Sequence, residues 1–447
     1  PNALTLAAWF ERAKKSHGDF LDGIDGSQWK ALAGMELNSR QLRNFLQKLD
    51  RPDVPNLPAL VVRDLQHKSS RGFGSVPVHK LLLQSQLEHC LSMRPELLNE
   101  PEFIRVYLTR LLPNADTSWI DDVQERVQYL ERLEQFTDRL APAHNSLKSH
   151  VLQHRLAHDL TQGDWDRERF LKFIRIPRRA SYANSEYLRS HPATQIAEIG
   201  DLLPLGNTED PGQLVKAYLE HFFLGEATWE GFSEFLSPDY LRRVFVETKI
   251  LAGVGDLERW YSLHDNSAYY EELEARVEIQ FPPNAQTHYA EGQEVRLDVD
   301  VKNVDTLLVK VFEIDAASFA RAMGREVDAS IDLDGLVAGS ETNYSYDEPA
   351  LRRVRRPFAF PGLNRPGVYV IDFIGGGLSS RAVIQIGALR MRQRAGSAGQ
   401  VIQVLDESGK LCLDAGDCVT NVCAVGKCAA ASCTDETRNG TETDTDC

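Results

Sequence analysis

Three histidines recur every four residues, at His150, His154 and His158, in a stretch whose apolar spacing predicts a helix. Residues four apart share one helix face, and imidazoles stacked there have the spacing of zinc ligands. A hydrolase of this helical zinc type also needs a glutamate beside the first histidine as general base, but Val151 stands there. A metal site is therefore one interpretation and a polar helix face is the other, and no catalytic residue is assigned.

A second candidate site lies near the carboxyl end, where carboxylates gather at Asp435, Glu442, Asp444 and Asp446. Closely spaced carboxylate oxygens suit calcium, although the spacing differs from that of an EF-hand loop. Calcium is the one cofactor that the sequence leaves open, and a solvated acidic surface is the alternative. No other cofactor is expected.

The cysteines are concentrated in the same segment. Cys90 stands alone in the earlier chain, and the other six are Cys412, Cys418, Cys423, Cys428, Cys433 and Cys447. Dense cysteine in a segment too small for an apolar core predicts a disulfide framework, whose pairing the sequence leaves open. Because disulfides persist in oxidising compartments, we expect an extracellular or cell-surface protein. Cys90 lies on an amphipathic stretch and is expected in the core.

Two sequons occur in the chain. They begin at Asn343 and Asn439, both in predicted loops, and each is a glycosylation candidate if the chain is secreted.

Charge and hydropathy exclude two classes of partner. The net charge of −15 disfavours nucleic acid, which is bound through clustered Lys and Arg. No apolar run is long enough to span a membrane. We therefore expect the partners to be other proteins or cell-surface components.

The elements that position these residues change character near Arg276. Residues 1–275 show helical periodicity with short connectors, which predicts a helical array with a break near 176–212. Residues 276–410 alternate apolar and polar side chains, as in Val295, Leu297, Val299 and Val301, and predict an antiparallel β-sandwich of about seven strands. The predicted strands lie near 294–301, 305–314, 326–332, 353–360, 367–374, 380–387 and 400–405. Residues 411–447 form the disulfide-rich module. The fold class is therefore α+β and multidomain.

The predicted sandwich resembles a known family. The turn and strand from Val301 to Phe312 and the strand Pro366-Gly367-Val368-Tyr369-Val370 are similar to macroglobulin-like sandwiches of the bacterial alpha-2-macroglobulin type. This resemblance, over about 275–410, implies an extracellular or periplasmic multidomain protein that traps proteases or marks surfaces. The Cys-Gly-Glu-Gln thioester motif of that family is absent here.

The tail resembles a different family. From Cys412 to Cys447 it is similar to a secreted cysteine-rich repeat of myxobacterial and protist proteins, and it stops before the final Gly-Gly of that repeat. The sequence also begins with Pro1 rather than Met. We therefore expect a piece of a longer polypeptide.

Together these features predict a non-enzymatic extracellular or surface protein with a protein-binding, adhesive or structural role. One alternative is part of a macroglobulin-type protease inhibitor. Another is a metal-dependent hydrolase that uses the face of His150, His154 and His158.

Overall fold

The structure is a computed structural model. It describes residues 30, 33–34, 36–113, 119–120, 122–192, 203–206, 210–263 and 267–387, together with the backbone of 390–396, 399–405, 423–424 and 427–428. By their contacts these residues form two compact units, and the division falls inside helix α8, between His154 and Arg155.

The first unit is helical. Its elements are α3 (Ser39–Lys48), α4 (Leu57–Gln66), α5 (Gln84–Met93), α6 (Pro101–Leu111), α7 (Val123–Asp138) and the first part of α8 (Asn145–Gln162), with short 3₁₀ turns at Pro77–Leu81, Pro95–Asn99 and Pro142–His144. A capping box starts α3: Asn38 accepts from the Gln41 amide at 3.0 Å, and Gln41 accepts from the Asn38 amide at 2.9 Å. The N-cap is therefore Asn38.

One apolar core holds this unit together. Phe45, Val61, Leu87 and Phe103 are buried in it. Cys90 is also buried there, which confirms it as a core residue, and burial raises the pKa of its thiol to about 12.

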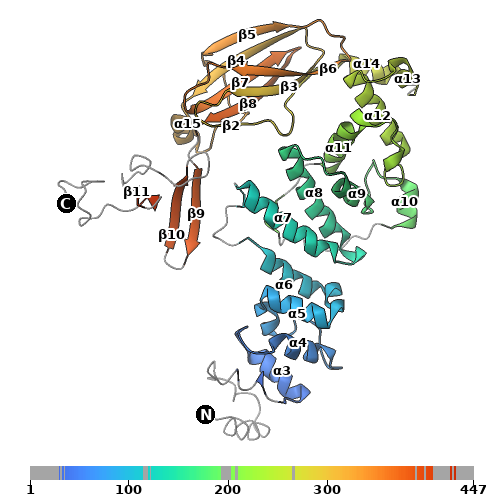
Figure 1. Ribbon diagram of the computed structural model, residues 1–447, viewed down its shortest axis with the longest axis vertical. Helices are drawn as coiled ribbons and strands as arrows, with labels where there is room; N and C mark the ends of the chain where they lie inside the picture. The colour runs from blue at the N-terminus through green and yellow to red at the C-terminus, as the bar shows by residue number, and fades with distance from the viewer. Residues whose placement is uncertain are drawn as a thin grey trace, which may run out of the picture. The chain divides into compact units, whose positions relative to one another are not determined.

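The second unit begins with helices. These are the rest of α8, then α9 (Arg167–Arg175), α10 (Ser185–Ser190), α11 (Pro211–Gly225), α12 (Pro238–Ala252), α13 (Leu257–Ser262) and α14 (Ser267–Ala275). Helices α11 and α12 lie side by side (Figure 1). Their interface is aromatic: the ring of Phe223 meets that of Phe245 edge to face with 5.1 Å between centroids. Gly253 ends α12 at a φ of 59°, a left-handed conformation that favours glycine.

A β-sandwich follows in the same unit. Its strands are β1 (Glu278–Gln280), β2 (His288–Tyr289), β3 (Val295–Lys302), β4 (Thr306–Ile314), β5 (Ser340–Ser345), β6 (Arg353–Phe360), β7 (Gly367–Gly375) and β8 (Leu378–Ile386). One sheet has the order β1-β3-β6 and the other β2-β8-β7-β4-β5. All pairs are antiparallel except β2 with β8.

The alternation predicted for β3 is observed. Val295, Leu297 and Val299 face the core between the sheets, where they join Ile371 and Phe373 of β7. The fold class is confirmed: a helical region precedes an antiparallel sandwich.

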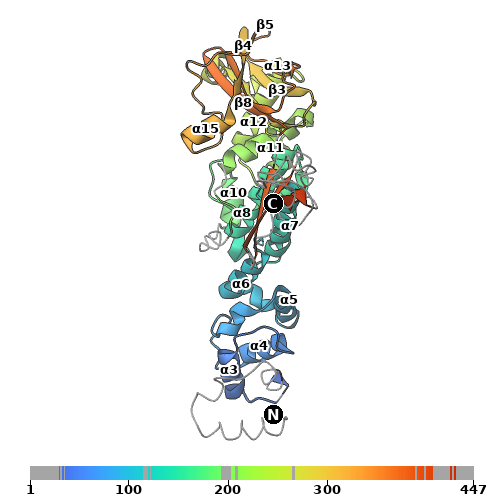
Figure 2. The ribbon, with the colours of Figure 1, turned by 90° about the vertical axis from the view of Figure 1, so that its left-hand side faces the viewer.

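The outer face of the larger sheet is also covered. Val370 packs against Val327, Ile331 and Leu333 of the β4–β5 crossover, which also contains α15 (Ala316–Met323), seen beside the strands in Figure 2. The strand predicted at 326–332 is therefore wrong. These residues form a loop whose apolar side chains seal the sheet.

The strand predicted at 400–405 exists but belongs elsewhere. It is β10 (Gly399–Leu405), which pairs only with β9 (Arg390–Gly396) as a two-stranded sheet among the described strands. Two short strands, β11 (Cys423–Ala424) and β12 (Lys427–Cys428), complete the described chain. No described helix is both long and apolar enough to cross a bilayer.

Candidate functional site

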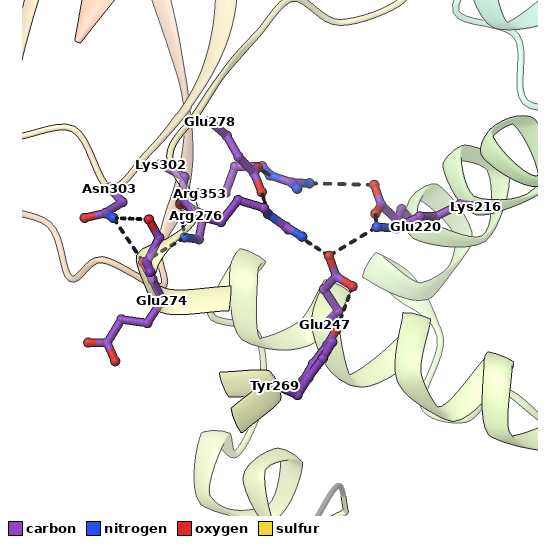
Figure 3. A network of polar contacts seen from close by, with 11 residues as sticks. Lys216, Glu220, Glu247, Tyr269, Glu274, Arg276, Glu278, Lys302, Asn303 and Arg353 are labelled. Carbon is purple, nitrogen blue, oxygen red and sulfur yellow. Dashed lines mark hydrogen bonds and ion pairs between the residues drawn. The ribbon is translucent and has the colours of Figure 1, made fainter. Parts of the chain in front are cut away.

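A polar cluster lies where helices α11, α12 and α14 meet the sandwich (Figure 3). Only two residues separate α14 from β1, so the last carbonyls of α14 lie beside the β3–β4 turn. The ammonium group of Lys302 donates to the carbonyl of Arg276 at 2.6 Å and to that of Glu274 at 3.3 Å. The amide of Asn303 donates to the carbonyls of Glu274 and Ala275 at 3.0 and 3.2 Å. The sandwich therefore caps the helix that leads into it.

A buried carboxylate extends this cluster to α12. The side chain of Glu247 is 6% exposed and accepts from Arg276 at 2.8 Å, from Lys216 of α11 at 3.2 Å and from the Tyr269 hydroxyl of α14 at 2.7 Å. Burial alone would raise the pKa of Glu247, but Lys216, Arg276 and Tyr269 outweigh it and lower the pKa to about 2. Glu247 is therefore an anion at any physiological pH.

A second buried carboxylate lies on β1. Glu278 is 3% exposed and accepts from Arg276 at 2.5 Å and from Arg353 of β6 at 2.6 Å. Arg353 also lies 3.6 Å from Glu220 of α11. Charges of opposite sign therefore alternate across α11, α12, the α14–β1 connection and β6. We call these side chains, with Lys302 and Asn303, the junction network.

This arrangement is suited to fixing positions. A general acid or base needs a pKa near the working pH, whereas the pKa of Glu247 is held far below it. The carboxylates of Glu247 and Glu278 each already accept hydrogen bonds from at least two donors. Buried ion pairs give little net stability, but breaking one is costly because it leaves a buried charge unpaired. The junction network therefore specifies how α11–α14 join the sandwich.

A hollow of about 370 Å³ lies elsewhere on the sandwich, next to β8 and the crossover. Its lining includes Phe281, His288, Val327, Asp328 and Arg381. The Arg381 guanidinium donates to the carbonyl of Ile331 at 2.7 Å, and Asp328 accepts from the Ser330 amide at 2.8 Å. These polar groups stabilise the crossover loop.

The histidines lie on α8 as predicted, but His154 and His158 are buried rather than on an exposed polar face. The rings of His150 and His154 meet edge to face with 4.6 Å between centroids. Burial, together with His150, lowers the pKa of His154 to about 4. No group of three or more His, Cys, Asp or Glu side chains with a metal-binding arrangement exists in the part of the chain that the structure describes. Zinc at this face stays a prediction.

Of the other predicted site residues, the structure describes Asn343 and leaves most of those in the carboxyl-terminal segment outside the described ranges. Asn343 is on edge strand β5, not in a loop. Asn439 and the acidic set Asp435, Glu442, Asp444 and Asp446 lie outside the described residues. So do Cys412, Cys418, Cys433 and Cys447, while the backbones of Cys423 and Cys428 face each other across β11 and β12.

The basic run at 352–356 is paired within the sandwich. Arg355 binds Asp300 at 2.8 Å with two nitrogens, and Arg356 binds Glu348. Arg353 is paired as well, so three of the four arginines in this run form ion pairs with carboxylates.

Sequence reasoning missed the junction network. The only local signal was the change from helical to strand periodicity at Arg276, with Glu278 two residues later. Glu247, Lys302 and Arg353 are distant in sequence and carry no motif. Only the packing of α12, β3 and β6 around the α14–β1 connection brings them together.

Two family models match the chain. Residues 3–277 match the actin-binding protein F N-terminal domain, and residues 307–387 match the AbpF first immunoglobulin-like domain. The chain is also similar to Actin-binding protein F of Dictyostelium discoideum, with 32% identity over 376 residues. That match covers 82% of this chain and 16% of the relative, so the chain spans a small part of its length.

These matches overturn several predictions. The sandwich is of the immunoglobulin-like type of this family, so the macroglobulin resemblance is wrong, and the relationship to a secreted cysteine-rich repeat is wrong as well. The extracellular or surface location is contradicted by the match to a family and a relative that are named for actin binding. The adhesive and protease-inhibitor roles, and the disulfides and secretion inferred with them, fall for the same reason. The two sandwich strands that carried the resemblance, β4 and β7, are common to many sandwiches.

Proposed function

Because this chain belongs to the actin-binding protein F family, we propose that it is a non-enzymatic cytoplasmic protein that binds actin. The observation that carries the proposal is the order of the two matches, with the N-terminal domain first and the immunoglobulin-like domain after it, across most of the chain. The relative is named for actin binding and is much longer than this chain. Contact between actin and this part of the protein is therefore our proposal.

The junction network supports a binding role. A protein that attaches a filament to further domains transmits force through each connection between folds. Here Arg276 lies in the two-residue connection and binds buried carboxylates on both sides, Glu247 of α12 and Glu278 of β1. Two further residues, Lys302 and Asn303, hold the end of α14. Such a connection resists bending because bending would expose unpaired charges.

The charge distribution supports a protein partner. Arg353, Arg355 and Arg356 are each held by a carboxylate of the same unit, so they are not available to neutralise phosphates. Together with the net charge of −15 this favours a protein surface over nucleic acid. We further propose that the helical array to residue 275 and the sandwich that follows it are two domains joined through the junction network, and that binding needs no cofactor.

Co-sedimentation of the purified chain with actin filaments tests the proposal. The chain is expected to pellet with filaments in a saturable manner and to stay in the supernatant without them. A Glu294→Gln variant is the matched control, because Glu294 binds only the neighbouring Arg296 on the exposed surface of the sandwich. A chain that is folded by circular dichroism but does not pellet at any filament concentration would contradict actin binding by this part of the protein.

A further inference from the structure

The loop between α9 and α10 reads Arg178-Arg179-Ala180-Ser181-Tyr182. The side chains of Arg179 and Ser181 are exposed, whereas Tyr182 is 5% exposed. Among the described residues the Ser181 hydroxyl has no hydrogen-bond partner, so the hydroxyl itself is accessible from solvent.

The residues around Ser181 match a charge pattern that enzymes read. Many serine/threonine kinases recognise two arginines, two and three residues before the acceptor, through acidic side chains, and they accept an apolar residue after it. Arg179, Arg178 and Tyr182 occupy these three positions. We propose that Ser181 is a phosphorylation site for an arginine-directed protein kinase, which goes beyond actin binding.

The reaction needs only the kinase and ATP. The Ser181 oxygen attacks the γ-phosphorus, and a new oxygen–phosphorus bond forms. The bond from that phosphorus to the oxygen bridging to the β-phosphorus breaks, and ADP leaves. The hydroxyl proton passes to the catalytic carboxylate of the kinase.

A second observation in the same loop points to an anion. The guanidinium of Arg178 lies 3.6 Å from the centre of the Phe173 ring and donates to the Phe173 carbonyl. Among the described residues no carboxylate forms an ion pair with it, and its Nε is buried without a hydrogen-bond partner. Burial lowers the pKa of Arg178, and the neighbouring Tyr182 hydroxyl opposes that shift only in part.

A phosphate on Ser181 would supply a counter-ion for Arg178. A phosphoserine carries a charge of about −1.5 to −2 and accepts strong hydrogen bonds from guanidinium groups. Ser181 is three residues from Arg178, within reach across a turn. Phosphorylation therefore stabilises the closed loop.

The kinase must first open this loop, because Tyr182 is buried and Arg178 is only partly exposed. Backbone bonds hold the segment closed: the backbone N–H of Ser237 donates to the Tyr182 carbonyl at 2.9 Å, that of Ala183 to the Ala180 carbonyl at 3.1 Å, and that of Asn184 to the Phe235 carbonyl at 2.9 Å. The side chain of Asn184 adds a bond of 2.8 Å to the Ser233 carbonyl. Loops held by bonds of this kind open locally without global unfolding.

The test is to incubate the whole chain with ATP and cAMP-dependent protein kinase, and to locate phosphate by mass spectrometry. Phosphate is expected on Ser181, with none at that position in Ser181→Ala. Arg179→Ala, at an exposed position, should slow labelling about tenfold or more. Asn184→Ala should speed it up by releasing the loop. Ser185→Ala is the matched control and should leave the rate unchanged.

Two results would overturn the proposal. One is the absence of phosphate at Ser181 in the folded chain while a peptide of residues 175–186 is labelled fully. The other is labelling that Arg179→Ala does not change. The counter-ion role has a separate readout: phosphorylation should raise Tm, and the rise should vanish in Arg178→Met, which keeps the packing on Phe173 but removes the charge. An unchanged or lower Tm would contradict that role.

Discussion

The guanidinium of Arg276 donates to the carboxylate of Glu247 at 2.8 Å, and this ion pair joins the α14–β1 connection to α12. The Glu247 side chain is 6% exposed, whereas that of Arg276 is 39% exposed. The carboxylate is therefore the member that depends on the pair, because it has no access to water as an alternative partner.

Glu247→Gln is expected to destabilise the chain. The amide keeps the shape of the carboxylate but removes the charge, and it leaves Arg276 and Lys216 without their shared anion. We expect the free energy of unfolding of the second unit to fall by about 2–4 kcal/mol. Urea denaturation measures this, and Glu294→Gln on the exposed surface should change it by less than about 0.5 kcal/mol. Equal effects of the two changes would refute the role given to Glu247.

The carboxylate of Glu247 also predicts that the folded chain loses stability in acid. The pKa of Glu247 is about 2 in the folded chain against an ordinary 4.5. Because the folded state holds this group ionised, its contribution of about 3 kcal/mol is complete above pH 4.5 and is lost as the pH falls toward 2. Denaturation curves at several pH values should show this loss, and Glu247→Gln should make the same limb shallower. A variant with an unchanged acid limb would contradict the lowered pKa.

The buried imidazole of His79 predicts that the free energy of unfolding of the first unit also depends on pH, in a higher pH range than that of Glu247. It is fully buried, stacks on Phe73 and accepts at Nδ1 from the Gly74 amide at 2.8 Å. Burial, with a smaller contribution from Arg43, lowers its pKa from 6.5 to about 4. Below pH 6.5 the unfolded chain takes up a proton that the folded chain does not. The free energy of unfolding therefore falls by up to about 3 kcal/mol as the pH drops to 4.

His79→Asn tests this effect, because the asparagine oxygen can replace Nδ1 as acceptor. The variant should be less stable at neutral pH, owing to lost packing, but its stability should vary less between pH 6.5 and 4. His67→Asn, at an exposed position, is the control and should keep the full slope. If the slope of His79→Asn equals that of the parent chain, another group causes it.

Asn303 combines two roles that substitution separates. Its φ of 55° is left-handed, and its amide donates to the end of α14. Asn303→Gly keeps the backbone conformation and loses the two bonds, so it should cost about 1–2 kcal/mol. Asn303→Ala adds backbone strain of about 1 kcal/mol. Thermal unfolding of both variants should give this order, and the reverse order would contradict the strain at this turn.

A last prediction rests on the proposed function. If actin contacts residues on both sides of the junction, loosening it should weaken binding although no contacting residue has changed. We expect Glu247→Gln to raise the apparent Kd for filaments several-fold at a temperature where the variant is still folded. Glu294→Gln should bind like the parent chain. Unchanged binding by Glu247→Gln would place the contact on one side of the junction.

The helices and strands were largely predictable because their signals are local. The alternation from Val295 to Val301 predicted β3, and the position of Cys90 among leucines predicted its burial. The sequence of 326–332 predicts a strand because Val327 and Ile331 are apolar and β-branched. Their burial comes instead from covering Val370 of a sheet that forms from distant segments.

The predicted extracellular or cell-surface location was wrong for a related reason. Closely spaced cysteines form stable disulfides only in an oxidising environment, and composition does not show which environment a chain meets. The match of residues 3–277 to the actin-binding protein F N-terminal domain is what contradicted the predicted compartment.

The sequence by itself determined the helical array, the antiparallel sandwich and the point near Arg276 where one gives way to the other, because periodicity is set by neighbours in the chain. Only the tertiary structure decided that Arg276 binds Glu247 and Glu278 and that Lys302 caps α14. These contacts join residues 2 to 29 positions apart. Charges in a sequence become a network only where folding removes water from between them, and no local pattern records where that happens.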